Sequence, residues 1–478
     1  MARTKQQQAV IDAVINNNGL VKTSAVAGSG KTYTLVELAN ELKPKSGLYI
    51  SYNKSIAEEA TRKFKGTNIK CSTIHSLAYG AVVRQYGLNV GHFGPRNVEP
   101  NSLPYKAKMA LVASLEKFFL SAYTDPEDYL IAIRASTKDK ELFWHHLNGM
   151  SNGTMVCSHS FYLKLYHIFI ADGTIPTPST DILLVDEAGD LTELTIELFK
   201  LIKAPKKIAV GDPMQNIYSF NNTVNAFKVL ANEGIQVNLT ESFRVSDKIA
   251  KGIQGFVQKH VDKEFEFVGH NYPEETPVVT SAYIARNNVG LIQQMFHCME
   301  NNIPFHTTRK IDQILELPLV LANLGNGKPI TEYKYKHIEK LRTQWERSGN
   351  LQQLSSINSY VYKNLKDDEE AKSAIRLVHD HGPRDLNNLA KYARDCAKVA
   401  CNYTFTTAHS SKGLEWDQVE IAPDLNDAVT TALVKIAKAK MSRDKKVIDL
   451  LQEELRLYYV AVSRCKLNLL NAKHLPKV

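Results

Sequence analysis

A short glycine-rich segment near the amino terminus is the feature that most restricts what this chain can fold into. Residues 27–32 read Ala-Gly-Ser-Gly-Lys-Thr, and they closely follow the segment Gly19–Ala25, which is predicted to form a buried strand. The helical pattern of Lys31–Leu42 begins within the same segment. A glycine loop between a strand and a helix turns backbone N–H groups toward a bound phosphate, so the sequence predicts an α/β fold with a parallel sheet and a phosphate site.

The polar side chains of this loop indicate which phosphate compound it binds. Lys31 is placed to neutralise β- and γ-phosphate oxygens, and the hydroxyl of Thr32 is placed to bind Mg²⁺. Ala25 stands where the general pattern has its first glycine. We therefore predict ATP and Mg²⁺ as the bound cofactors. The loop around the phosphates would consist of Ala27, Gly28, Ser29 and Gly30.

Two further strand ends carry polar residues that suit the same site. The apolar run 182–185 ends in Asp186 and Glu187, and the run 207–210 is followed by Gln215. Because the carboxyl ends of parallel strands meet at one edge of a sheet, these side chains should face the ligand. In phosphoryl transfer Asp186 would hold Mg²⁺, Glu187 would act as the general base on water, and Gln215 would sense the γ-phosphate.

Some features are compatible with nucleic-acid binding without requiring it. Tyr218 and Phe220 could stack on bases, which contributes about 1–3 kcal/mol per base, or they could pack in the core. The net charge of +9 favours polyanions only modestly. The basic stretch 435–446 is typical of a solvated helix face, and a surface that tracks phosphates is the alternative.

The length of 478 residues exceeds one ordinary core and predicts two to four domains. Residues 85–175 are helix-rich, with aromatic residues at helical spacing, and they indicate an insertion. A second α/β region begins near Pro277, with apolar runs at 278–279 and 283–285, and it resumes at 403–406 after a polar helical stretch.

The composition excludes several classes of protein. A hydrophobic content of 44% with 23% charged residues is typical of a globular chain. No stretch approaches the roughly 20 apolar residues that span a bilayer, and residues 1–6 lack the apolar core of a secretory signal, so we expect an intracellular protein. Of the six cysteines, Cys396 and Cys401 are the only close pair, without a partner pair at zinc spacing, which favours reduced thiols over a metal site.

Together these segments resemble superfamily 1A helicases of the UvrD/Rep/PcrA type. The match follows the order of the family's motifs over nearly the whole chain, and residues 407–416, Thr-Ala-His-Ser-Ser-Lys-Gly-Leu-Glu-Trp, are close to a signature of that family. The other matching segments are 6–10, 51–54, 72–78, 186–190, 211–220, 239–244 and 457–466.

The resemblance implies two tandem RecA-like P-loop NTPase domains with mainly helical insertions, and ATP in the cleft between the two domains. The implied segments are a first RecA-like domain (1–84 and 176–272), its helical insertion (85–175), a second RecA-like domain (273–323 and 399–478) and a short helical insertion (324–398).

The resemblance also assigns roles that spacing alone cannot. It implies that Gln6 reads adenine, that Glu415 contacts the ribose, and that Arg244 and Arg464 are arginine fingers on the transferred phosphoryl group. The residues that would contact DNA are Asn53, Lys54, Thr73, His75, Tyr218, Phe220 and His409.

Three departures from the family pattern concern the nucleotide site and the second insertion. Gly189 stands in the acidic segment where the family usually has glutamine, which would loosen the link between hydrolysis and DNA. Tyr33 replaces an arginine and Phe243 replaces a tyrosine, so adenine would lie between two aromatic rings, an arrangement that bears on base selectivity. The insertion at 324–398 is much shorter than the regulatory subdomain of UvrD-type enzymes.

Within the superfamily, the sequence most resembles the helicase core of F-box DNA helicases, through residues 52–57, 75–80, 211–213 and 224–226. No amino-terminal segment remains for an F-box, so coupling to a ubiquitin ligase is not expected. We expect a monomeric ATP-dependent helicase that moves 3′→5′ on single-stranded DNA and acts at junctions with duplex, in replication, recombination or repair.

Three alternatives remain open at this stage. One is a translocase that displaces proteins, such as recombinase filaments, without sustained unwinding, and the short insertion mildly favours it. Another is a DNA-binding scaffold with an inactive ATPase, which the complete set of phosphoryl-transfer residues disfavours. An RNA helicase is the third.

Overall fold

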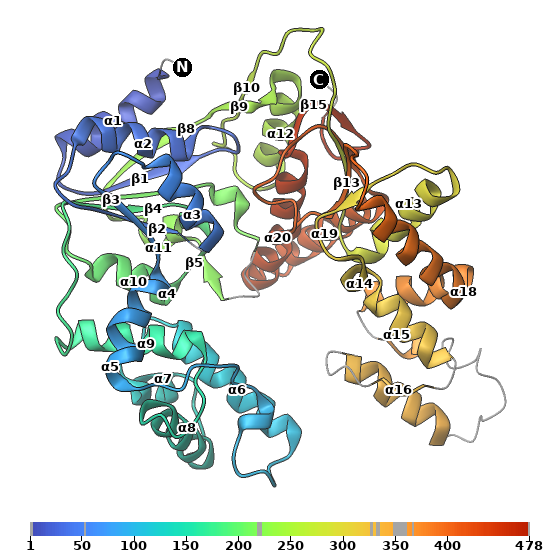
Figure 1. Ribbon diagram of the computed structural model, residues 1–478, viewed down its shortest axis with the longest axis horizontal. Helices are drawn as coiled ribbons and strands as arrows, with labels where there is room; N and C mark the ends of the chain where they lie inside the picture. The colour runs from blue at the N-terminus through green and yellow to red at the C-terminus, as the bar shows by residue number, and fades with distance from the viewer. Residues whose placement is uncertain are drawn as a thin grey trace. The chain divides into compact units, whose positions relative to one another are not determined.

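The computed structural model describes residues 3–51, 54–217, 222–325, 328–330, 335–347, 361–365 and 368–476. The chain divides into two compact units, Met1–Phe243 and Arg244–Val478 (Figure 1). Within the described residues, no helix combines the length and apolarity needed to cross a membrane. The four domain segments predicted from the sequence remain a prediction.

A parallel sheet forms the centre of the first unit. Its strands lie in the order β3-β2-β4-β6-β1-β8, and each neighbouring pair is parallel, as predicted. The inner strands are buried on both faces, which explains their nearly continuous apolar sequences. The strand bounds are β1 (Gly19–Ala25), β2 (Gly47–Ser51), β3 (Ile69–Thr73), β4 (Ile182–Val185), β6 (Lys206–Gly211) and β8 (Ile235–Leu239).

Helices cover both faces of this sheet because alternate strand residues point to opposite sides. Tyr49 and Leu184 belong to the core under α1 (Lys5–Asn16) and α2 (Lys31–Leu42). Leu48 and Leu183 belong to the core of the other face, which α10 shares. Figure 1 shows α1 and α2 on one side of the sheet and α10 on the other. The remaining helices here are α3 (Lys54–Lys63), α10 (Glu193–Leu201) and α11 (Ala226–Val229).

The stretch between β3 and β4 is helical, as the aromatic spacing predicts. Phe118, Phe119, Phe143 and Phe161 are buried together in its core. A short antiparallel pair, β5 (Leu191–Thr192) with β7 (Thr223–Val224), follows β4. The helices are α4 (Ile74–Ala78), a π-helical turn at Tyr79–Val83, α5 (Arg84–Tyr86), α6 (Tyr105–Leu120), α7 (Pro126–Ala132), α8 (Thr137–Ser151) and α9 (His159–Ala171).

The second unit contains another parallel sheet, in the order β12-β13-β11-β14-β15. The predicted runs 283–285 and 403–406 lie in β11 and β13. The apolar run 278–279 lies outside any strand, because both side chains are exposed and the Val279 N–H donates to the carboxylate of Asp417 (3.0 Å) instead of to a neighbouring strand. The bounds are β11 (Ser281–Ala285), β12 (His306–Thr307), β13 (Tyr403–Thr407), β14 (Trp416–Ile421) and β15 (Cys465–Leu470).

Helices flank this second sheet, and β9 (Glu241–Ser246) carries the chain into the unit and pairs with β10 (Val268–His270). The longest helical stretch, α18, is interrupted at Gly382 (φ 66°), where Pro383 lacks a backbone donor. The helices are α12 (Asp247–His260), α13 (Asn288–Glu300), α14 (Ile311–Ile314), α15 (Glu316–Gly325), α16 (Lys336–Arg347), α18 (Glu369–Cys396), α19 (Pro423–Met441) and α20 (Lys445–Val462).

Candidate active site

The glycine loop connects the carboxyl end of β1 to the first turn of α2. Gly28 (φ 76°) and Gly30 (φ 78°) both adopt left-handed backbone conformations that a side chain would strain. The loop is fixed from outside: the Ser242 hydroxyl donates to the Ala27 carbonyl and the Phe243 N–H donates to the Gly28 carbonyl, both at 2.8 Å. These hydrogen bonds fix the loop at the start of α2, where the first N–H groups of a helix have no acceptor within the helix itself.

The loop has the properties that bound phosphates require. Gly30 offers no side-chain cap to α2, whose first residue is Lys31, so the amino-terminal end of the helix dipole and a cation coincide. The hydroxyl oxygen of Ser29 is buried and has no hydrogen-bond partner within the described part of the chain. A phosphate oxygen would satisfy all of these groups, so the residues present fit the triphosphate of ATP.

The acidic side of the site is built by the residues that follow β4. The Asp186 Oδ2 atom accepts a hydrogen bond from the Tyr49 hydroxyl (2.9 Å) and a longer one from the Thr32 hydroxyl (3.4 Å). The Lys31 ammonium lies 3.9 Å from a carboxylate oxygen of Glu187. The structure therefore brings Lys31 and Thr32 together with Asp186 and Glu187, which lie far away along the chain, since Thr32 and Asp186 are 154 positions apart.

Electrostatics at this point favour a divalent cation. Burial raises the pKa of Asp186, and the negative charge of Glu187 raises it further, while Lys31 acts in the opposite direction. Burial and then the charge of Asp186 raise the pKa of Tyr49, which keeps its hydroxyl a donor. A cation bound to the Asp186 carboxylate and the Thr32 hydroxyl would favour the ionised carboxylate, so this pair fits Mg²⁺.

Glu187 is in an unusual backbone conformation. Its φ is 54°, in the left-handed region that non-glycine residues seldom adopt, and its N–H donates to the Asp186 Oδ1 atom (2.8 Å). Strained conformations of this kind persist only where surrounding structure fixes them, and they are frequent at functional sites. Its half-buried position next to Lys31 is compatible with the general-base role.

The segment after β6 holds Gln215 against a buried acid. The Gln215 amide donates to Asp212 Oδ2 (2.8 Å), and Asp212 Oδ1 accepts from the Met214 N–H (2.9 Å). Gly189 lies against the same segment: a β-carbon there would be 2.8 Å from the Asp212 carbonyl oxygen, and the Asn216 amide donates to the Gly189 carbonyl. The absence of a side chain at 189 therefore permits close backbone packing in the acidic segment.

The predicted adenine end lies beside the loop. Gln6 is already engaged, accepting from the Thr240 N–H (2.8 Å) and donating to the Thr240 hydroxyl (2.9 Å). Tyr33 and Phe243 are exposed to 38% and 40%, so both rings are accessible to a base. Gln7, which no sequence motif marked as a separate contact to the loop, is buried and donates to the Ser29 carbonyl (3.4 Å).

Three of the predicted nucleotide residues belong to the second unit. The Arg244 guanidinium donates to Glu415 (2.6 Å), and Lys466 lies 3.1 Å from the other oxygen of that carboxylate. Burial opposes ionisation of Glu415, but Arg244 and Lys466 outweigh it and lower its pKa. Arg464 is only 1% exposed, and its guanidinium donates to the Val460 carbonyl (2.9 Å).

The predicted DNA-contacting residues are dispersed. Thr73 caps the amino terminus of α4, and His75 lies in that helix, beside a cavity of about 540 Å³ that Ser51 and Asp190 also line. Burial, and then the neighbouring His159, lower the pKa of His75. Lys54 is exposed, and His409, in the second unit, is half-buried. The three remaining candidates, Asn53, Tyr218 and Phe220, lie outside the described residues.

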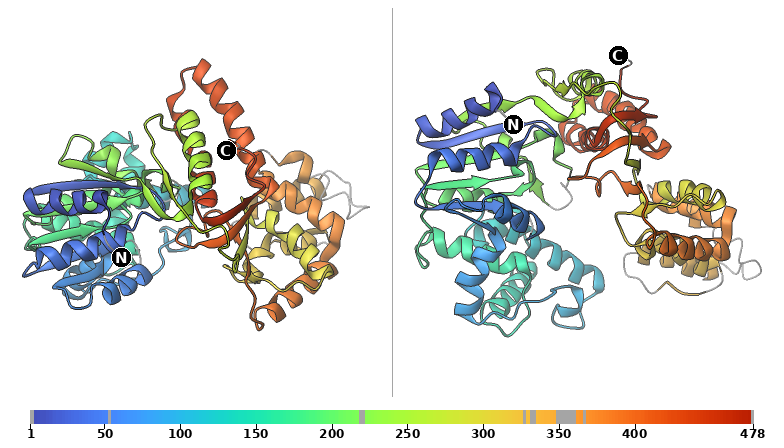
Figure 2. Two further views of the ribbon diagram at one scale, coloured as in Figure 1. Left: turned by 90° about the horizontal axis from the view of Figure 1, so that it is seen from above. Right: turned by 45° about the horizontal axis from the view of Figure 1, so that its top comes forward.

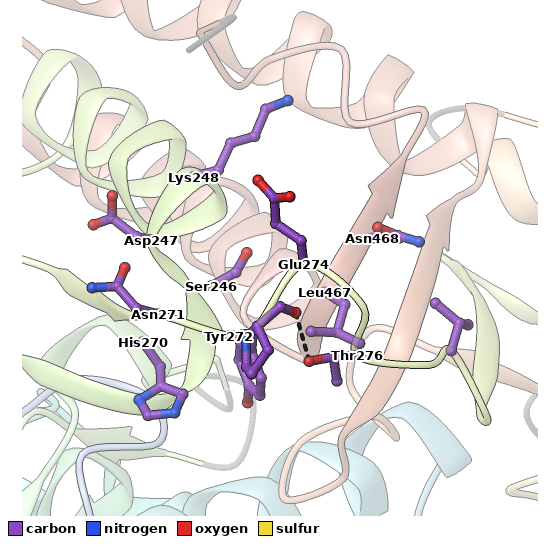
Figure 3. A pocket seen from close by; sticks show the side chains of 12 residues that line it. Ser246, Asp247, Lys248, His270, Asn271, Tyr272, Glu274, Thr276, Leu467 and Asn468 are labelled. Carbon is purple, nitrogen blue, oxygen red and sulfur yellow. Dashed lines mark hydrogen bonds between the residues drawn. The ribbon is translucent and has the colours of Figure 1, made fainter.

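A polar hollow of about 350 Å³ lies in the second unit beside the start of α12 (Figure 3). Its wall includes Tyr272, whose hydroxyl donates to the Arg244 carbonyl (2.8 Å), and Asp247, which pairs with Lys251. The hydrogen bond from Tyr272 thus helps to hold the backbone at Arg244 in place.

A parallel sheet whose first strand enters a phosphate loop, with acids at the end of a neighbouring strand, defines a P-loop NTPase with a RecA-like fold. A family model described as an AAA domain matches residues 6–221 of the chain.

Two curated proteins resemble nearly the whole chain. F-box DNA helicase protein 1 of Schizosaccharomyces pombe (strain 972 / ATCC 24843) is 26% identical over 525 residues, which cover 98% of this chain and 57% of that protein. F-box DNA helicase 1 of Gallus gallus is 26% identical over 527 residues, which cover 99% of this chain and 49% of that protein. The chain thus spans about half the length of these relatives. The matches confirm the resemblance to a superfamily 1 helicase core.

Proposed function

We propose that the chain is an ATP-dependent DNA helicase, a DNA-stimulated ATPase that moves 3′→5′ on single-stranded DNA. The observation that carries the proposal is the convergence of Lys31, Thr32, Asp186 and Glu187 at one edge of a parallel sheet. The names of the two relatives as DNA helicases support DNA as the track.

The proposed chemistry follows from the positions of these side chains. Lys31 would bind β- and γ-phosphate oxygens, and Thr32 and Asp186 would hold Mg²⁺, which would neutralise charge on the phosphates. Glu187 orients the attacking water and accepts its proton. Gln215, held by Asp212, reports the presence of the γ-phosphate to the segment that follows it.

The remaining predicted residues complete this proposal. Gln6, Tyr33 and Phe243 would recognise adenine, and Glu415 would contact the ribose. Arg244 and Arg464 would stabilise charge on the transferred phosphoryl group, a contribution of about 10³–10⁵ in rate where it has been measured.

DNA would contact residues of both units. The proposed contacts among the described residues are Lys54, Thr73, His75 and His409. ATP binding would favour one arrangement of these contacts and hydrolysis another, because a ligand shifts a conformational equilibrium by its differential affinity for the two states. Alternation between the two would move the protein along one strand. Such a protein would act where cellular DNA is, in the nucleus of a eukaryotic cell or in the cytoplasm of a bacterial one.

The second candidate is a translocase that displaces DNA-bound proteins, such as recombinase filaments, without sustained unwinding. The observation that favours it is the small size of the 324–398 segment, described only in part here, relative to the regulatory subdomain of UvrD-type enzymes. Duplex substrates with a 3′ or 5′ single-stranded tail, compared with protein-blocked single strands, distinguish the two activities and give the polarity.

The ATPase assignment is tested with Lys31→Ala. We expect this variant to lose DNA-stimulated ATP hydrolysis and to retain binding to oligothymidine, because Lys31 is directed at phosphates and not at the track. Measured turnover close to that of the unaltered protein would refute the assignment. An unaltered protein whose ATPase responds to RNA but not to DNA would refute the choice of track.

A further inference from the structure

The second unit contains a helical hairpin whose free end is not explained by the nucleotide site. Helices α19 and α20 pack side by side (Figure 2), joined by residues 442–444 with Arg443 in a left-handed conformation (φ 56°). Asp444 caps α20 by accepting from the Val447 N–H (3.1 Å). Toward the sheet the hairpin is well packed, with Val429 buried in α19 and Leu455 buried in α20.

Near its free end the hairpin carries a hollow of about 490 Å³ with aliphatic walls. Val447 is 39% exposed and Leu450 is 66% exposed, while Met441, at the end of α19, is 87% exposed. Isolated exposed apolar side chains are ordinary, but Val447 and Leu450 face one concave surface. The principal lining residues are Lys435, Lys438, Ala439, Val447, Leu450 and Leu451.

Two lysines, Lys435 and Lys438, line this hollow, and further basic residues follow them along the hairpin. Positions 435–447 contain six basic residues and one acidic residue, Asp444, which also lines the hollow and already caps α20. Across the described part of the chain, no acidic oxygen lies within 4.0 Å of the five described cations. These are Lys435, Lys438, Lys440, Arg443 and Lys445.

The stability of the two helices accounts for only part of this charge. Lys438 and Lys440 lie in the last turn of α19, where cations interact favourably with the helix dipole. Lys445 is the first residue of α20, where the same dipole disfavours a cation. The helix dipole therefore does not account for the basic side chain at that position.

We propose that this hollow binds an acidic segment of a partner protein, with aliphatic or aromatic side chains between its carboxylates. The carboxylates would pair with Lys435, Lys438 and Lys445, and the apolar side chains would cover Val447 and Leu450. A nucleic acid fits the surface less well. The lining residues include no aromatic ring on which a base could stack, and phosphates would leave the aliphatic wall uncovered.

The test uses the full chain and a fluorescein-labelled synthetic peptide in which aspartates alternate with leucine and phenylalanine. A peptide with serine in place of the apolar residues and a labelled oligothymidine serve as competing probes. The variants are Leu450→Asp and Lys438→Glu. Val399→Asp and Lys263→Glu are matched controls, because they replace an aliphatic residue by aspartate and a lysine by glutamate at other exposed positions of the second unit.

We expect fluorescence anisotropy to show saturable binding of the acidic apolar peptide, weakened about tenfold or more by each hairpin variant and not by either control. The serine peptide should bind much more weakly. No binding to the unaltered protein, or equal binding to all variants, would overturn the proposal. Loss of oligothymidine affinity in Lys438→Glu without loss of peptide affinity would assign the surface to nucleic acid instead. Circular dichroism of each variant confirms that a loss of binding is not a loss of folding.

Discussion

Tyr49→Phe isolates the hydrogen bond that holds the acidic side of the site. Tyr49 is fully buried in β2, and its hydroxyl donates to Asp186 at 2.9 Å. Its ring packs against Phe64, with centroids 5.3 Å apart, and phenylalanine preserves that packing. The substitution therefore removes one hydrogen bond to a buried carboxylate and little else.

The expected cost follows from the charge of the acceptor. A hydrogen bond to a charged group contributes about 1.5–3 kcal/mol, and one between neutral groups about 0.5–1.5 kcal/mol. Tyr129→Phe is the matched control, because the Tyr129 hydroxyl donates to the neutral Ser114 carbonyl, also at 2.9 Å, and Tyr129 is 5% exposed. We expect urea unfolding to show that Tyr49→Phe costs about 1 kcal/mol more than Tyr129→Phe.

The pH dependence gives a second, independent reading. Burial raises the pKa of Asp186, and removal of the Tyr49 hydroxyl would raise it further. When the pKa of a carboxyl group is higher in the folded protein than in the unfolded chain, the free energy of unfolding falls as the pH rises between the two values. The cost of Tyr49→Phe should therefore increase once the pH exceeds the raised pKa of Asp186 in the folded protein, whereas the cost of Tyr129→Phe should stay constant.

The same loss should appear in catalysis. A less readily ionised Asp186 binds a divalent cation more weakly, so the Mg²⁺ concentration that gives half-maximal ATPase should rise in Tyr49→Phe and not in Tyr129→Phe. Equal, pH-independent losses of stability in the two variants would refute the reasoning, because Asp186 would then not be an ionised acceptor. An unchanged Mg²⁺ requirement would show that the hydrogen bond from Tyr49 does not affect cation binding at Asp186.

Two further predictions concern the first unit. Gly189→Gln, which restores the usual family residue, should lower the free energy of unfolding by about 1–3 kcal/mol, because its β-carbon would press on the Asp212 carbonyl. A decrease in melting temperature no larger than that of a substitution at an exposed position would contradict this prediction. Burial lowers the pKa of Lys164 in the folded protein to about 7. Between that pH and the ordinary lysine pKa of about 10.5, the unfolded chain therefore binds one more proton at Lys164 than the folded protein does. The free energy of unfolding should rise with pH in this range by up to about 1.4 kcal/mol per pH unit. This slope is measured by denaturant unfolding of the unaltered protein and of Lys164→Met at several pH values. If the free energies of unfolding of the two proteins changed with pH in the same way, the prediction would be wrong.

The parts of the fold and site that could be predicted are those fixed by local backbone requirements. The bounds of β1 and α2 were predicted correctly, because the glycines between them need left-handed conformations that end the strand and open the helix. Asp186 and Glu187 were placed at the site because a fully apolar strand must lie inside the sheet, which puts the residues after it at the ligand-binding edge.

The contacts between distant segments could not be predicted in the same way. Tyr49 gave little signal beyond one hydroxyl within a buried strand, and its partner Asp186 is 137 positions away. Gln7 had a weak signal in its capping box with Thr4, which explains its position on α1 but not its approach to the loop. The apolar run 278–279 forms no strand, although the similar run 283–285 does, because apolar sequence alone does not reveal whether a neighbouring strand is available for pairing.

The pairing of Arg244 with Glu415 bears on the proposed division of roles at the nucleotide. The resemblance assigns one residue to the γ-phosphate and the other to the ribose, whereas in the structure the two bind each other at 2.6 Å. Their side chains are 18% and 42% exposed, and ion pairs this accessible contribute at most about 1 kcal/mol. Separating them would thus reduce the apparent affinity for ATP by no more than about fivefold, which contacts with a triphosphate easily offset. Lys466 remains beside Glu415 after Arg244 leaves, so one of the two cations that lower the pKa of this carboxyl group still favours the ionised form that accepts hydrogen bonds from ribose hydroxyls. The ion pair is therefore compatible with both proposed roles, and its low strength suits a contact that must break and reform in every ATPase cycle.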